Sequence, residues 1–109
     1  LTVMAAIKVL ALRQAHKTKS AEPASTYFSE LEQGLIVLLV DRLEGKTQIQ
    51  KNPHPKGSLA WAAWAIARLG GWKGYSKSES PPGVITIQRG LDQFESMIIG
   101  FELARNIQP

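Results

Sequence analysis

One stretch constrains the fold more than any other part of the sequence: residues 57–72, which read Gly-Ser-Leu-Ala-Trp-Ala-Ala-Trp-Ala-Ile-Ala-Arg-Leu-Gly-Gly-Trp. Ser58 is a natural N-cap, because its hydroxyl can accept a hydrogen bond from a backbone N–H of the first helical turn. Gly70 and Gly71 follow the last apolar position, where a left-handed C-terminal cap favours a residue without a Cβ. The alanines between them favour helix and let neighbouring backbones approach closely. The stretch therefore predicts a short central helix.

The apolar residues of this helix form one stripe at helical spacing, made of Leu59, Ala62, Ala63, Ile66 and Leu69 or Gly70. Three tryptophans add aromatic surface on the flanks of the stripe. We therefore expect a helical core that includes Trp61, Trp64 and Ile66 from this segment and Leu91, Phe94 and Ile98 from the last helix.

Two further helices are predicted before this segment. Residues 1–15 are apolar at helical spacing but begin without a capping residue or a polar first turn, which suggests that the chain is a piece of a longer protein. Ser29-Glu-Leu-Glu32 has the form of a capping box and opens a helix that runs to about Glu44 and is closed by Gly45. The loop that follows is polar and stiffened by prolines at its end.

The last predicted helix runs from Thr86, its expected N-cap, to about Asn106. Val84-Ile-Thr-Ile87 could also form a short strand, but the sequence offers no convincing partner strand. The whole chain, residues 1–109, is therefore predicted to be one all-α domain, a compact bundle of about four helices.

The last helix has two apolar faces. Ile87, Leu91, Phe94, Ile98 and Phe101 repeat at alternating spacings of four and three, the pattern of helices that pack at a shallow angle, and we expect this seam to face the core. Glycines interrupt the helix, at a cost of about 1 kcal/mol each relative to alanine. They suggest close backbone contact at Gly90 and Gly100, although simple tolerance of glycine explains them equally well. The second face either packs under the Trp-rich helix or forms an interface with another subunit, through Met97, Gly100, Leu103 and Ala104.

The formal net charge of +4 and the isoelectric point near 9.6 raise the chance of contact with nucleic acid. Much of the positive charge lies in predicted loops, and the candidates for DNA contact are Lys46, Lys51, Lys56 and Lys73. The alternative is an ordinary solvated surface. The longest apolar run, Leu35–Val40, is far shorter than the roughly 20 residues that a membrane span needs, so no contact with a membrane is expected.

No catalytic motif is present in the sequence. The chain has no cysteine, no phosphate-binding Gly-rich motif and no Gly-x-Ser-x-Gly motif. His16 and His54 stand alone, each without a second His, Cys or carboxylate at metal-binding spacing, so we expect surface or loop roles for both. The pairs Asp41/Glu44 and Asp92/Glu95 can each share a helix face, but such pairs usually belong to solvated surfaces. The residues alone therefore favour a binding or assembly domain over an enzyme.

Several short motifs in the second half of the chain occur together: Gly57-Ser-Leu-x-Trp61, Trp64-x-Ile-Ala-Arg-Leu-Gly-Gly-Trp72, Pro82-Gly83, Thr86 and Arg89-Gly-Leu-x-x-Phe94. This combination resembles the C-terminal dimerisation domain of the transposon-Tn-five-type transposases in insertion-sequence family four, which are bacterial enzymes. The resemblance covers nearly the whole chain and is firmest over residues 57–106, whereas residues 1–45 match in pattern only.

The resemblance implies a non-catalytic domain that pairs two transposase subunits into the complex that brings both transposon ends together. In this family the catalytic core holds two aspartates and one glutamate that bind Mg²⁺, and the glutamate lies in a Tyr-x-x-Arg-x-x-x-Glu arrangement that this chain lacks. No catalytic residue, metal or cofactor is therefore expected here. The implied partners are a second copy, through the last helix, and transposon-end DNA in the full-length protein, within the bacterial cytoplasm. The alternative is a basic helical module that contacts DNA directly.

Overall fold

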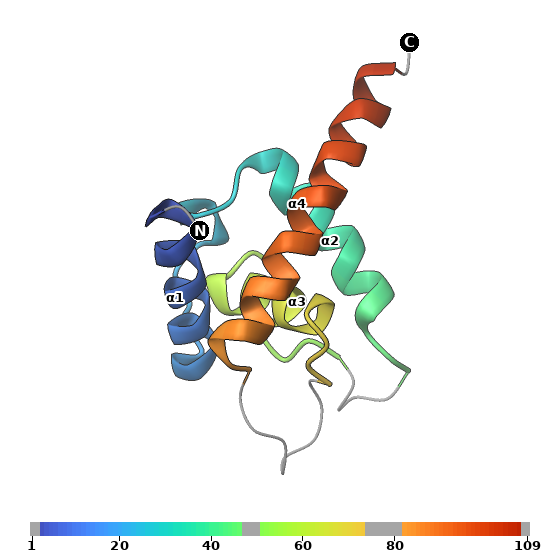
Figure 1. The fold of residues 1–109 in the computed structure, drawn as a ribbon. Helices are drawn as coiled ribbons and strands as arrows, with labels where there is room; N and C mark the ends of the chain where they lie inside the picture. The colour runs from blue at the N-terminus through green and yellow to red at the C-terminus, as the bar shows by residue number, and fades with distance from the viewer. Residues whose placement is uncertain (1–2, 47–50, 74–81, 108–109) are drawn as a thin grey trace.

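The Trp-rich segment forms a short helix, α3 (Leu59–Leu69), around which three longer helices pack in the computed structural model of the chain (Figure 1). The structure describes residues 3–46, 51–73 and 82–107. Within these residues the other elements are α1 (Val3–Thr18), a short 3-10 helix η1 (Ala24–Thr26), α2 (Glu30–Leu43) and α4 (Val84–Ile107). Apart from an isolated bridge between Pro23 and Ser58, the described backbone has no β-structure, so the prediction of an all-α fold with four helices is confirmed.

Both ends of α3 are fixed by the residues that the sequence suggested. The Ser58 hydroxyl accepts a hydrogen bond from the backbone N–H of Trp61 at 3.1 Å. At the other end Gly70 stays close to helical geometry with φ −77°, and Gly71 adopts the left-handed conformation with φ +105°. The left-handed residue is thus the second glycine, because Gly70, the C-cap, keeps a right-handed conformation.

The side chains of α3 are covered on every side and not only along the predicted stripe. Every residue from Leu59 to Ala67 is buried, and Trp64 and Ile66 are among the largest fully buried side chains. Trp61, Leu91 and Phe94 are also buried, as predicted. Ile98, which was also expected in the core, is only partly buried and packs against the edge of the buried cluster.

The other predicted boundaries need small corrections. The capping box before α2 is present, with Ser29 and Glu32 bonded to each other's backbone N–H groups at 3.1 and 2.8 Å. This helix ends at Leu43, because Glu44 is extended, and Gly45 therefore plays no part in the cap. The helix predicted over residues 1–15 continues to Thr18. The last helix begins at Val84 and not after Thr86, since Ile87 N–H already donates to the Gly83 carbonyl at 3.1 Å.

Helices α3 and α4 touch through two glycines that face each other's backbones. A Cβ at Gly70 would lie 1.9 Å from the carbonyl oxygen of Thr86, and a Cβ at Gly90 would lie 1.8 Å from the carbonyl oxygen of Ile66. No side chain fits at either position without moving one helix. At Gly100, by contrast, a Cβ would meet nothing within 4 Å, so close contact within the chain exists at Gly90 and is absent at Gly100.

These two glycines of α4 give a matched test of the packing. We expect Gly90→Ala to lower the free energy of unfolding by about 1–3 kcal/mol, because α3 and α4 must separate to make room for the methyl group. Gly100→Ala should leave it unchanged or raise it by up to about 1 kcal/mol, since alanine favours helix and the site is open. Urea unfolding of both variants measures the difference, and equal effects would show that the close contact is absent in solution.

Candidate functional site

The predicted subunit interface lies on the C-terminal half of α4, which projects away from the rest of the molecule in Figure 1. Met97 and Leu103 are 40% and 56% exposed, and Gly100 and Ala104 are exposed between them. The alternative, in which this face packs under the Trp-rich helix, is therefore wrong. Ser96 is exposed one turn before Gly100, so three small residues follow one another at intervals of four along this surface.

The four candidate lysines for DNA contact, Lys46, Lys51, Lys56 and Lys73, are all exposed. Arg68 brings two of them toward one end of the molecule. Its guanidinium donates to the Leu43 carbonyl at the end of α2, at 2.8 Å, and also to the carbonyl of Lys73. The segments that follow α2 and α3 lie together at the end of the molecule opposite the C-terminus of α4 (Figure 1). The basic residues Lys46 and Lys73 are thus far from the predicted pairing surface.

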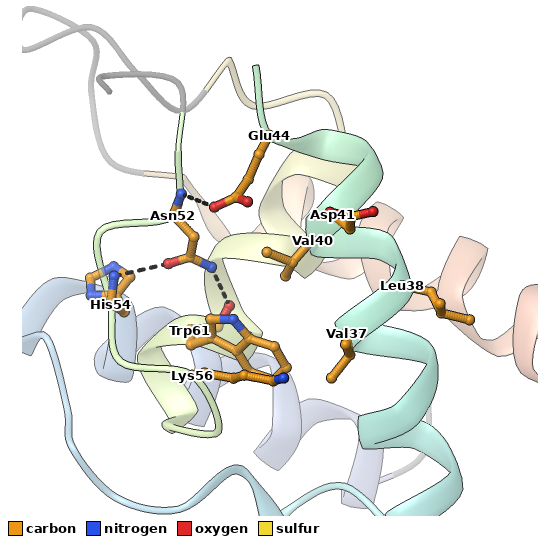
Figure 2. A pocket seen from close by; sticks show the side chains of 9 residues that line it. All are labelled: Val37, Leu38, Val40, Asp41, Glu44, Asn52, His54, Lys56 and Trp61. Atoms are coloured by element: carbon orange, nitrogen blue, oxygen red, sulfur yellow. Dashed lines mark hydrogen bonds between the residues drawn. The ribbon is translucent and has the colours of Figure 1, made fainter. Parts of the chain in front are cut away.

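A shallow groove of about 430 Å³ lies between the C-terminal half of α2 and the loop of residues 51–57 (Figure 2). Its floor is apolar and its rims carry charge of both signs, from the lining residues Val37, Leu38, Val40, Asp41, Glu44, Asn52, His54, Lys56 and Trp61. The sequence pairs Asp41 with Glu44 but does not place Lys56 beside them, because the loop and α2 meet only through tertiary packing.

Asn52 holds the loop against both α2 and α3. Its backbone N–H donates to the carboxylate of Glu44 at 2.8 Å, and its side-chain amide donates to the Trp61 carbonyl at 3.1 Å. Its side-chain oxygen accepts a hydrogen bond from the His54 N–H at 3.0 Å (Figure 2). The Ser58 hydroxyl, at the end of this loop, caps α3 and donates a hydrogen bond to the Pro55 carbonyl at 2.7 Å. Glu44, Asn52 and the His54 N–H are thus engaged in holding the loop that forms one wall of the groove.

The two histidines, which the sequence analysis treated as separate side chains, meet in space. The centroids of the His16 and His54 rings are 5.9 Å apart, and the Trp72 ring packs edge-on against His16 with a centroid distance of 4.7 Å. Burial and then the charge of His54 lower the pKa of His16 to about 4. Burial and then the charge of Lys19 lower the pKa of His54. Both imidazoles are therefore neutral at pH 7.

Only weak sequence signals point to the residues that organise this region. Arg68 is a basic residue in the last turn of a helix, where it interacts well with terminal carbonyls, but its partner on α2 was not visible. Asn52 precedes a Pro-His-Pro segment, which predicts a turn and says nothing of contacts with Glu44.

Comparisons with known families, curated proteins and solved structures gave no match to this chain. The resemblance to transposases therefore stays a prediction. Among the described residues, no three His, Cys, Asp or Glu side chains are placed to hold a metal ion together. In the same part of the chain, none of the helices combines the length and the apolar character that crossing a bilayer requires.

The role of Asn52 can be tested by truncation. We expect Asn52→Ala to lower the free energy of unfolding by about 1–3 kcal/mol, because the variant leaves the Trp61 carbonyl and the His54 N–H without their hydrogen-bond partner. The matched change Asn106→Ala, at an exposed position near the end of α4, should have an effect within about 0.5 kcal/mol. Thermal unfolding of the two variants compares them, and similar losses would contradict an organising role for Asn52.

Proposed function

We propose that this chain is a subunit-pairing domain that associates with a second copy through the exposed surface of α4. We call this surface the pairing face and define it as Ser96, Met97, Gly100, Leu103 and Ala104. The observation that carries the proposal is the exposure of Met97 and Leu103 on a helix that projects beyond its own core.

The composition of the pairing face suits contact between two helices. Small residues at intervals of about one turn let helix backbones approach closely, and the larger apolar side chains beside them supply contact area. No atom in the described part of the chain comes within 4 Å of a Cβ placed on Gly100, so this position has room for a partner. A second copy offers the same small and apolar residues, and a two-fold axis brings identical surfaces together.

The parent function that we propose is that of a cut-and-paste DNA transposase, in which this domain is not catalytic. The support is the group of motifs between Gly57 and Phe94 together with the exposed pairing face. Pairing of two subunits would hold two transposon ends in one complex, so that cleavage is coupled to synapsis. The Mg²⁺ chemistry of such an enzyme would belong to its catalytic core, since two-metal catalysis needs a cluster of carboxylates.

Direct contact with DNA is a second candidate function, and the position of the basic lysines favours it. Lys46 and Lys73 lie at the opposite end of the molecule from the pairing face, so both surfaces can be occupied at once. Phosphate contacts by lysine are sequence-independent and weaken steeply with salt.

A negative charge on α4 should prevent pairing only when it lies on the pairing face. We expect Ala104→Asp to abolish pairing while the domain stays folded, because the carboxylate would be buried between two helices without a partner. Asn106→Asp adds the same charge to the same end of α4, at a position about 160° from Ala104 around the helix axis. We expect this control variant to pair normally. Sedimentation over a concentration series measures pairing of the isolated chain, and assembly of paired-end complexes measures it in the full-length parent. Normal pairing of the Ala104→Asp variant would place the contact elsewhere.

The dependence on salt concentration distinguishes self-association from binding to DNA. We expect self-association of the chain to persist as salt is raised, since burial of apolar area does not require release of counterions. Binding to a DNA duplex should weaken linearly on a logarithmic plot against salt, with a slope set by the number of phosphate contacts. Light scattering and DNA titration over the same salt series provide both readings, and self-association that disappears with salt would contradict an apolar interface.

A further inference from the structure

The loop of residues 51–57 is fastened to the molecule at both of its ends. Near its start, Asn52 N–H donates to Glu44 at 2.8 Å. At its far end, Ala24 N–H donates to the Gly57 carbonyl at 2.8 Å, and the next residue, Ser58, donates to the Pro55 carbonyl through its N–H at 3.1 Å. Between these anchors, His54 joins the loop to α1 through the ring of His16.

Three separate segments therefore meet at one pair of imidazoles. His16 belongs to the last turn of α1, His54 to the loop, and Trp72 to the segment that follows α3. As neutral aromatic rings, the histidines and Trp72 pack edge to face, which is a favoured arrangement. We call this group, His16, His54 and Trp72, the histidine junction.

The charged groups around the histidine junction make protonation unfavourable. A proton on each ring would place two positive charges about as far apart as the ring centroids, 5.9 Å. Lys19 already acts on His54 by charge. Lys17 on α1, Lys56 in the loop and Lys73 next to Trp72 are further cationic residues of the segments that meet there, and all three are exposed. The carboxylates that share the groove with His54 are Asp41 and Glu44, and Glu44 is already bonded to Asn52.

We propose that the histidine junction is an acid-sensitive latch: protonation of His16 and His54 releases the loop of residues 51–57 from α1, breaks its hydrogen bonds to Glu44 and Ala24, and so opens the groove beside α2. The rest of the core does not depend on these two rings. Val9, Leu12 and Ala15 still anchor α1 in the core, and α3 remains buried among apolar side chains.

The direction of the pH dependence follows from the burial of the rings. Their pKa values are lowered in the closed structure, so the open loop binds more protons than the closed loop. Closure is therefore unaffected above the free imidazole pKa of 6.5 and is lost progressively as the pH falls from there toward about 4, the pKa of His16. Within this window the open population rises by up to about tenfold per pH unit for each proton taken up.

Amide hydrogen exchange at pH 7, 5.5 and 4.5, corrected for the intrinsic exchange rate, tests the latch. The reporters are the Asn52 and Ala24 amides, which hold the loop, and the α3 amides from Ala63 to Ala67 serve as the internal reference. We expect the reporters to lose protection by tenfold or more at pH 4.5 while the reference keeps its own. The double variant His16→Phe/His54→Phe keeps the rings but cannot take up a proton, and its reporters should show no acid-dependent loss.

A second measurement keeps the test decisive if the double variant fails to fold. Imidazole titration of the single variant His54→Phe, followed by NMR, should show a higher midpoint for His16 than the wild type, because the charge of His54 is gone. The latch is refuted if the reporters of the wild type keep their protection at pH 4.5, if the reference amides lose theirs together with the loop, or if the His16 midpoint does not change in His54→Phe.

Discussion

The contact between α3 and α4 at Gly70 and Gly90 is the constraint on which the rest of the structure depends. At both positions the opposite carbonyl lies where a Cβ would otherwise stand, so the two backbones meet over one turn of each helix. Such an approach fixes the distance and the direction of α4 relative to α3 more tightly than contact through flexible side chains can. Because α4 sits so close, the alanines of α3 are buried without larger side chains to fill the space.

The unequal lengths of these two helices account for the exposed pairing face. α3 has 11 residues and α4 has 24, so at about 1.5 Å per residue α3 covers roughly 16 Å of a helix about 36 Å long. The contact lies near the start of α4, at Thr86 and Gly90. The second half of α4 therefore extends past the core, and its apolar residues lack a neighbour from α3. The burial of the seam falls off in the same direction, from fully buried Ile87 and Phe94 to half-buried Ile98 and Phe101.

Local signals in the sequence were sufficient for the helices and for most of the core. The caps at Ser29 and Ser58 are short-range hydrogen bonds, and the seam of α4 follows from periodicity alone, so both could be predicted. What failed depended on contacts between distant segments. Gly90 and Gly100 look alike in the sequence, yet only the first meets another backbone. The meeting of His16 with His54 likewise requires the loop to be held by Asn52 and Glu44, which no spacing rule contains.

The candidate sites could be predicted in part for the same reason. The exposure of an apolar face on α4 could be predicted because a helix with two apolar faces exceeds what a small core can cover. The groove beside α2 could not, since its walls come from α2, the loop and α3.

Arg68 connects the basic end of the molecule to the central helix α3. One guanidinium ties the end of α2 to the segment after α3, and it also lies over the ring of buried Trp64, 5.6 Å from the ring centroid. The basic end is thereby anchored to α3 itself, whereas the pairing face is carried on the free half of α4. The proposed pairing face and the basic residues are therefore linked through the core, because Arg68 joins the basic end to α3 and α3 packs against α4.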